Sequence, residues 1–279
     1  MEKVSKIQNL FLEQAKKQKR KIGITILRPI DETMKSLKRA SKFADLVVVG
    51  AKVSGFENIV EDDNDTASKI LIGLLKDKKV DGIVRGQVKD SYTLDEFFRQ
   101  FGRETIPSNR KICPIVLRKG DYTLVVSTCS VYHALTFEDK IYEAERVIKY
   151  MKEDLGIEPK IAVMGILRPT SKRGKYKILD EITERCTKLY QYLVNKGYEA
   201  KEYYMEYETA VWDRCNLIVP SIGFVGNSWV KSLMYLDDWQ IICCPYLDLG
   251  VAYEDGSRNE KDFYWHIVHA VAMANSQEK

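Results

Sequence analysis

Two copies of one pattern, an apolar run that ends in Leu-Arg-Pro, constrain this chain more than any other feature of its sequence. The first copy spans 21–29 and the second spans 160–169. Each run is typical of a buried strand and precedes a helical stretch. Ligands of open α/β sheets bind beyond the carboxyl ends of strands, where an arginine can hold a phosphate or carboxylate through two parallel hydrogen bonds. The repeat predicts two α/β halves that offer Arg28 and Arg168 to a shared anionic ligand, although solvated arginines beside strand-ending prolines would leave the same pattern.

Apolar runs and helical patterns alternate along the rest of the chain, which predicts mostly parallel sheets. The acidic segment 57–65 is predicted to be a solvated loop, and the hairpin-like segment 112–127 indicates a change of domain. We predict one α/β domain from 1–111 with 248–279, and a second from 112–247. The strands are expected at 22–27, 46–49, 80–84, 112–117, 122–127, 198–205, 216–222 and 240–244, and the main helices at 31–43, 65–77, 91–100, 176–195, 226–236 and 260–274.

The composition excludes several classes of protein. The net charge of +4 over 279 residues gives little support to nucleic-acid binding. No apolar run approaches the roughly 20 residues needed to span a bilayer, and the N-terminus lacks the apolar core of a signal peptide. The six cysteines form no C-x-x-C pair, which disfavours a zinc or iron–sulfur knuckle and favours a reducing compartment. We therefore predict a cytoplasmic protein with neither nucleic-acid nor membrane partners.

Three loops carry side chains suited to an anionic ligand, and two of them follow predicted strands directly. Arg85-Gly86 follows the strand at 80–84, and the glycine permits a close approach of ligand to backbone. Asn227 lies in a second strand-to-helix turn, where it is either a ligand-lining residue or a helix cap. Ser257 and Arg258 precede the last helix, and Ser257 with a glutamate three residues on is also a capping-box pattern.

A metal site is the weakest of the possibilities considered. Asp262, His266 and His269 share one side of the last predicted helix and have suitable donor atoms. No fourth ligand is evident, and the apolar residues between them are typical of a core helix. We predict no metal.

Taken in order, the segments from about 21 to 274 resemble the phosphate acetyl/butyryltransferase family. The Leu-Arg-Pro start and the short length are closest to a divergent archaeal branch of it that is linked to methanogenesis. The resemblance rests on the turn 84–88, the hairpin 112–127, the small residues 127–131 before an acidic helix, the Ser/Thr-Lys-Gly loop in 166–174, the Pro220…Gly226-Asn227…Lys231 pattern and the Pro245…Asp255…Ser257-Arg258 segment.

The resemblance implies two α/β domains with mostly parallel sheets and a cleft between them, as in phosphate acetyltransferases and the isocitrate/isopropylmalate dehydrogenase-like fold. Family members move an acyl group between coenzyme A and phosphate, so a coenzyme A-like or other phosphate-bearing ligand and a homodimer are implied. Ser257 would contact the thiolate or reacting oxygen, Arg258 would stabilise developing charge, and Asp262 would be the acidic residue of the last helix, although it comes early by spacing. The implied ligand-binding residues are Arg28, Arg85, Gly86, Arg110, Arg168, Ser171 and Asn227.

Two functions stay open. One is a transferase of acyl or methyl groups that acts with methyltransferase components of methanogenesis. The other is a non-catalytic ligand-binding or accessory protein of methyl-transfer metabolism. Asn259 and Glu260 stand where the family has small residues, and no glycine-rich loop typical of S-adenosylmethionine binding follows the first strand.

Overall fold

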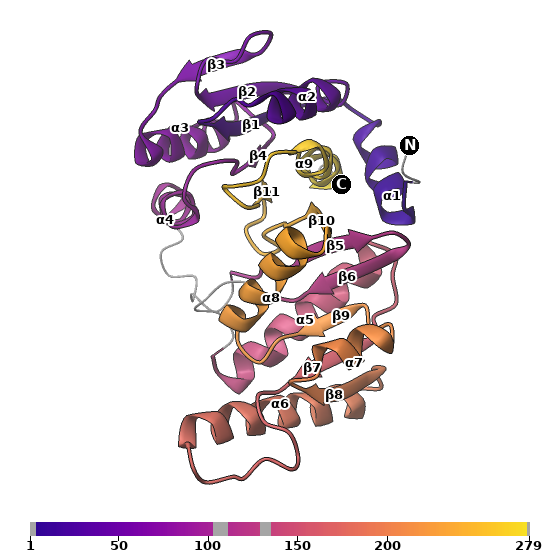
Figure 1. Ribbon diagram of the computed structural model, residues 1–279. Helices are drawn as coiled ribbons and strands as arrows, with labels where there is room; N and C mark the ends of the chain where they lie inside the picture. Colours follow the sequence, from indigo (N-terminus) through magenta and orange to yellow (C-terminus); the bar gives the residue numbers. More distant parts are fainter. Residues whose placement is uncertain (1–3, 103–110, 129–134, 278–279) are drawn as a thin grey trace. The chain divides into compact units, whose positions relative to one another are not determined.

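The computed structural model describes residues 4–102, 111–128 and 135–277, and the chain divides into two compact units (Figure 1). The first unit combines 1–107 with 242–279, and the second spans 108–241. The sequence analysis places its boundaries at 111/112 and 247/248. Among the helices formed by the described residues, none has both the length and the apolar character that a bilayer crossing requires.

The first unit is built on a five-stranded, fully parallel sheet. Its strand order is β11-β4-β1-β2-β3. Glu254 at the end of β11 lies level with Val84 at the end of β4, and Val84 lies level with Ile24 in β1. The loops after these three strands therefore meet at one side of the sheet, which we call the carboxyl edge. The strand bounds are β1 Arg20–Ile26, β2 Ala44–Gly50, β3 Glu57–Val60, β4 Gly82–Val84 and β11 Ala252–Glu254.

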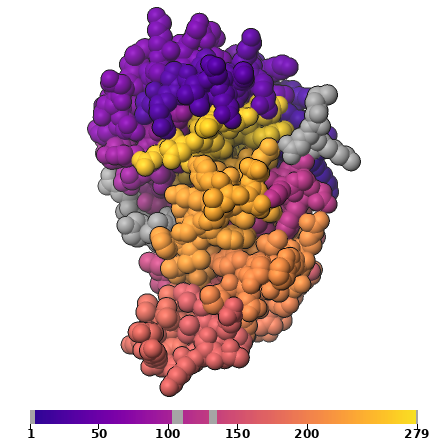
Figure 2. Space-filling view, in the orientation of Figure 1, coloured from indigo at the N-terminus to yellow at the C-terminus, as the bar shows by residue number. Residues whose placement is uncertain are grey.

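Helices cover both faces of this sheet. The last helix packs against α1, α2 and strands β1, β2, β4 and β11, while α3 packs against α4 and the central strands. Figure 2 shows the yellow last helix lying against the indigo and purple residues of the N-terminal segment. The last helix is nearly all apolar because it forms the core between these elements. The bounds are α1 Lys6–Ala15, α2 Asp31–Ala40, α3 Asn64–Lys76, α4 Asp90–Phe101 and α9 Tyr264–Gln277.

Two predictions for the first unit are wrong in detail. Residues 57–60 form the edge strand β3, parallel to β2, where the sequence indicated a solvated loop. Edge strands tolerate charged and half-exposed residues, which hides their periodicity. The last helix begins at Tyr264 and not near 260, because the segment before it forms a separate turn.

The second unit is built on a six-stranded mixed sheet of order β10-β5-β6-β9-β7-β8, whose edge strand β10 continues to Cys243, past the division between the units at 241/242. β5 and β6 form the predicted antiparallel hairpin, and β6, β9, β7 and β8 run parallel. The predicted α/β class with mostly parallel sheets is confirmed. The bounds are β5 Ile115–Lys119, β6 Tyr122–Val126, α5 Phe137–Glu153, β7 Ile161–Met164, α6 Lys177–Asn195, β8 Ala200–Tyr204, α7 Tyr207–Trp212, β9 Leu217–Val219, α8 Gly223–Leu236 and β10 Gln240–Cys243.

Two residues of α5, Lys140 and Glu143, form a fully buried pair. The Nζ of Lys140 donates a hydrogen bond of 2.5 Å to the carbonyl of Pro220 and lies 3.9 Å from a carboxylate oxygen of Glu143. Ser127 donates a hydrogen bond to the same carboxyl group. Burial raises the pKa of Glu143, and the opposing effects of Lys140 and Ser127 are smaller.

We expect Glu143→Gln to alter how stability depends on pH. The raised pKa means that the folded chain holds this proton more tightly than the unfolded chain. The contribution of Glu143 is therefore fully present below the unfolded pKa of about 4.3 and is lost as the pH rises through the folded pKa. The free energy of unfolding of the wild type should fall relative to that of Glu143→Gln over this range, as measured by urea unfolding at successive pH values.

Glu153→Gln is the matched control, because Glu153 is an exposed residue at the end of the same helix. Its unfolding free energy should follow that of the wild type. A difference between wild type and Glu143→Gln that does not change with pH would contradict the prediction.

Candidate ligand-binding site at the carboxyl edge of the first sheet

Arg85, directly after β4, forms a buried bridge to the end of β11. Its side chain is 6 % exposed and its Nε donates to the carboxylate of Asp255. Its Nη1 donates to the carbonyl of Val88 at 2.6 Å, and its Nη2 donates to the carbonyl of Gly256. Burial raises the pKa of Asp255 to about 6, and the opposing effect of the Arg85 guanidinium, which lowers this pKa, is smaller. Arg85 thus holds two loops together, and its predicted contact with a ligand stays a prediction.

Gly86 is required by a close approach between β4 and β1. Its φ is +69°, and an added Cβ would lie 2.0 Å from the carbonyl oxygen of Thr25. The Thr25 hydroxyl donates to the carbonyl of Arg85, and the backbone N–H of Gln87 donates to the carbonyl of Thr25 at 3.0 Å. The segment directly after β4 therefore lies against the backbone of β1. This contact alone accounts for a glycine at position 86.

Gln87 shapes the loop that carries Arg28. Its Oε1 accepts the backbone N–H groups of Leu27 at 2.9 Å and Arg28 at 2.7 Å, and its Nε2 donates to the carbonyl of Arg28 at 3.3 Å. Sequence analysis did not identify this residue as part of the site. A glutamine one residue after a strand-ending Arg-Gly carries no local signal that it will bind a loop 60 residues away.

Two exposed arginines lie together at this edge. The Nη2 of Arg28 donates to the backbone carbonyl of Arg258 at 3.0 Å and to the Asn259 side chain at 3.4 Å. Both partners are neutral, and Arg28 forms no ion pair with any residue in the described ranges. The guanidinium of Arg258 is exposed and has no hydrogen-bond or ion-pair partner among the residues that the structure describes. The backbone of Arg258 thus contacts the Arg28 side chain, and the predicted contacts of both arginines with an anion stay predictions.

Ser257 lies in a tight turn between β11 and α9. Its hydroxyl accepts the backbone N–H of Asn259 at 3.3 Å, and its own N–H donates to the Glu260 carboxylate at 3.3 Å. The predicted capping-box residues therefore interact, but they do not begin a helix. The turn places Ser257 beside Arg258 at the carboxyl edge.

Asp262 makes a different set of contacts. Its carboxylate accepts from Arg39 on α2 at 2.9 Å and from the backbone N–H of Tyr264 at 2.9 Å. Asp262 thus caps α9 and joins it to α2. Its predicted catalytic role stays a prediction.

The remaining predicted residues belong to the second unit or lie outside the described residues, as Arg110 does. Arg168 is exposed and pairs with Glu206 at 3.1 Å. The backbone N–H of Ser171 donates to the carbonyl of Arg168 at 2.9 Å. Asn227 lies in the second turn of α8, whose N-cap is Ile222, so its alternative role as a helix cap is wrong. The contacts of these residues with a ligand stay predictions.

A buried carboxylate, Glu254, lies directly beneath the edge. It accepts the backbone N–H of Cys244 at 2.9 Å, its other oxygen contacts Nδ1 of His269, and Nδ1 of His266 lies 2.9 Å away. Nε2 of His266 lies 3.1 Å from the carboxylate of Glu260. Burial opposes the charge on His266, but the two carboxylates raise its pKa to about 10. Glu254 was missed from the sequence because β11 has only three residues and no recognisable strand pattern.

Comparisons with known proteins support the sequence-based resemblance. No family model matches the chain. It is 25% identical over 278 residues to a Methanosarcina mazei protein named "Putative methyltransferase mtx subunit X", with 94% of this chain and 92% of that protein covered. A Methanosarcina barkeri protein of the same name is 25% identical over 272 residues, with 94% and 96% covered.

Solved structures give the fold. A phosphotransacetylase from Streptococcus pyogenes superimposes with a TM-score of 0.62 at 15% identity, covering 98% of this chain and 99% of that one. A branched-chain phosphotransacylase from Enterococcus faecalis has a TM-score of 0.60 at 15% identity, with 93% and 99% covered. The chain is similar to the methanogen proteins called subunit X and has a phosphotransacetylase fold. The expected resemblance and fold are both confirmed.

We expect Gly86→Ala to lower the free energy of unfolding by at least about 2 kcal/mol, because a methyl group would collide with the backbone of Thr25. Gly55→Ala in the same unit is the control, since Gly55 also has a positive φ (+86°) but no atom within 4 Å of its added Cβ. That variant should lose only the backbone cost of about 1 kcal/mol. Urea unfolding measures both, and equal losses would show that the contact with β1 is not what requires glycine.

Proposed function

We propose that this protein binds a coenzyme A-like or other phosphate-bearing ligand at the carboxyl edge of the first sheet, as a phosphate acyltransferase-like protein of methanogen metabolism. The observation that carries the proposal is the pair of exposed arginines, Arg28 and Arg258, neither of which contacts an acidic side chain in the part of the chain that the structure describes. Two exposed arginines on segments that contact each other favour a ligand with two or more negative charges.

The proposed chemistry follows from the position of the turn. In acyl transfer, a phosphate oxygen attacks the carbonyl of a thioester, a C–O bond forms, the C–S bond breaks and the thiolate leaves. Negative charge develops first on the carbonyl oxygen and then on the sulfur. In our proposal Arg258 stabilises that charge and Ser257, beside it, donates a hydrogen bond to the reacting oxygen or the thiolate. Arg28 binds a phosphate group and fixes its position.

The names of the relatives suggest where such a protein acts. Both reported Methanosarcina relatives are named as a subunit of a methyltransferase. We therefore propose that this chain associates with methyltransferase components, with the anion site facing a cofactor that carries phosphate.

An accessory role without chemistry is the second candidate. It is favoured by the contacts of Asp262, whose carboxylate is used to join α9 to Arg39. A site that has lost its acidic catalytic group would retain the arginines that bind the ligand.

We expect Arg258→Ala to weaken binding of acetyl coenzyme A or inorganic phosphate about 10- to 100-fold, because a charged hydrogen bond contributes roughly 1.5–3 kcal/mol. Arg28→Ala should have a similar effect. The measurement is isothermal titration calorimetry of the purified protein with coenzyme A, acetyl coenzyme A and phosphate, followed by assay of acetyl transfer to phosphate.

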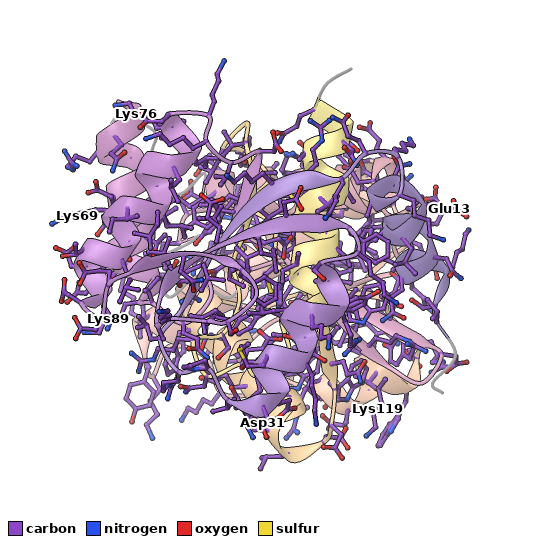
Figure 3. The ribbon with its side chains drawn as sticks, turned by 90° about the horizontal axis from the view of Figure 1, so that it is seen from above. Glu13, Asp31, Lys69, Lys76, Lys89 and Lys119 are labelled. Atoms are coloured by element: carbon purple, nitrogen blue, oxygen red, sulfur yellow. The ribbon has the colours of Figure 1, made fainter. Side chains whose placement is uncertain are left out.

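Lys76→Ala is the control. It removes the same charge at the end of α3, and Figure 3 shows Lys76 and Asp31, the first residue of α2, at opposite ends of the first unit. Its binding should equal that of the wild type. Binding without transfer would favour the accessory role, and no binding of any of the three ligands would refute the proposed site.

A further inference from the structure

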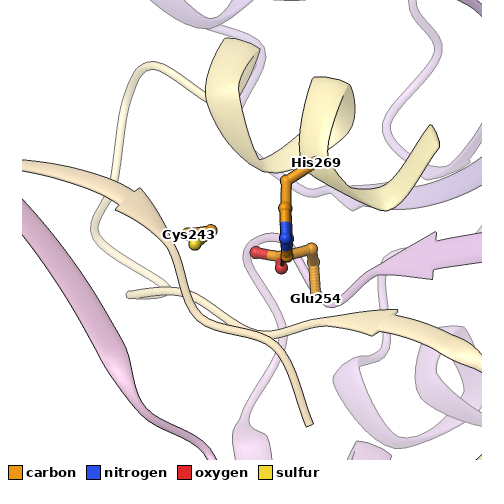
Figure 4. Close-up of side chains that lie close together, drawn as sticks. All are labelled: Cys243, Glu254 and His269. Atoms are coloured by element: carbon orange, nitrogen blue, oxygen red, sulfur yellow. Dashed lines mark hydrogen bonds and ion pairs between the residues drawn. The ribbon is translucent and has the colours of Figure 1, made fainter. Parts of the chain in front are cut away.

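Three donor groups of different chemistry converge inside the first unit. The thiol of Cys243, a carboxylate oxygen of Glu254 and a ring nitrogen of His269 all lie within 4.8 Å of one another (Figure 4). They come from the end of β10, the end of β11 and the middle of α9. All three residues are buried, with exposed fractions of 0 %, 0 % and 3 %.

These donors are the ones that zinc-class metal ions prefer. Zn²⁺ binds cysteine sulfur, histidine nitrogen and carboxylate oxygen, commonly with four ligands in a tetrahedron. A thiolate and a carboxylate would together balance the double charge of the ion, so the buried group would be neutral. This matters because an uncompensated charge is costly at a site without solvent.

Surrounding contacts hold the donors in position, as the outer contacts of metal ligands usually do. The backbone N–H of Cys244 donates to Oε2 of Glu254 at 2.9 Å, and His266 lies 2.9 Å from the same oxygen. The other oxygen of Glu254 faces His269. The ring of Phe11 packs on that of His269 with centroids 4.2 Å apart.

We propose that Cys243, Glu254 and His269 form a buried binding site for one divalent metal ion of the zinc class. For all three to coordinate one ion, the Cys243 thiol would lose its proton, and the ion would take the place of the hydrogen bond between Glu254 and His269. Metal binding to such groups releases protons. Three protein ligands leave one coordination position for water.

The site differs from the one considered from the sequence. Asp262 is not a ligand of the proposed site, because its carboxylate accepts hydrogen bonds from Arg39 and from the backbone N–H of Tyr264. His266 is a supporting residue, placed between the carboxylates of Glu254 and Glu260. The proposal thus departs from our expectation of no metal, and its three ligands are brought together by the tertiary structure.

The test is a titration of the chelator-treated, reduced protein with Co²⁺ alone, followed by absorption spectroscopy. Cobalt bound to a thiolate gives a near-ultraviolet charge-transfer band that cobalt bound to oxygen or nitrogen lacks. We expect one ion per chain with this band in the wild type. Cys243→Ser should lose the band and bind at least tenfold more weakly, and His269→Gln should also bind at least tenfold more weakly.

Cys244→Ser is the matched control, because Cys244 is the adjacent buried cysteine, donates its backbone N–H to Glu254 and is not one of the three grouped donors. It should keep both the band and the affinity. Zn²⁺ should also raise the thermal unfolding midpoint of the wild type and of Cys244→Ser, but not that of Cys243→Ser.

A wild-type protein that binds no ion, or binds one without the thiolate band, would overturn the proposal. Equal affinities of Cys243→Ser and Cys244→Ser would also overturn it. Circular dichroism establishes that each variant is folded. If Cys243→Ser does not fold, the wild-type band together with the at least tenfold weaker binding of His269→Gln decides the question.

Discussion

The buried ion pair of Arg85 and Asp255 is the contact on which the carboxyl edge of the first unit depends. It joins segments 170 residues apart, because β4 belongs to the N-terminal part of the chain and β11 to the C-terminal part. Burying two charges is costly, and it is tolerated only where further hydrogen bonds are made. Arg85 makes these bonds to the carbonyls of Val88 and Gly256, and the second of these fixes the start of the turn that holds Ser257 and Arg258.

Charges at this edge are arranged in two layers that serve different purposes. In the inner layer every carboxylate has a cation or a hydrogen-bond donor beside it, as Asp255 has Arg85 and Glu254 has two histidines. In the outer layer, the contacts of Arg28 with other described residues are to neutral oxygens. The inner layer therefore sets the geometry and adds little net charge, whereas the outer layer supplies the positive potential that an anionic ligand would meet.

The sequence was informative where the signal is local. Long amphipathic helices such as α3 and α6 and the hairpin of β5 and β6 were placed correctly, because their periodicity or turn is contained in one short stretch. It failed for the three-residue strand β11, which is too short to show a period. The sequence also did not predict that Cys243 lies close to Glu254 and His269, because separate elements bring these residues together.

The repeated Leu-Arg-Pro shows how the same local sequence acquires different electrostatic properties. In the first copy β1 ends at Ile26, and Gln87 holds the following loop so that Arg28 contacts a carbonyl and an amide oxygen. In the second copy β7 ends earlier, at Met164, and Arg168 pairs with the carboxylate of Glu206. Such an exposed pair contributes only about 0.2–1 kcal/mol, but it does cancel much of the local charge. An anion is therefore attracted more strongly to Arg28 than to Arg168. The two copies are not equivalent as anion-binding groups even though their sequences match.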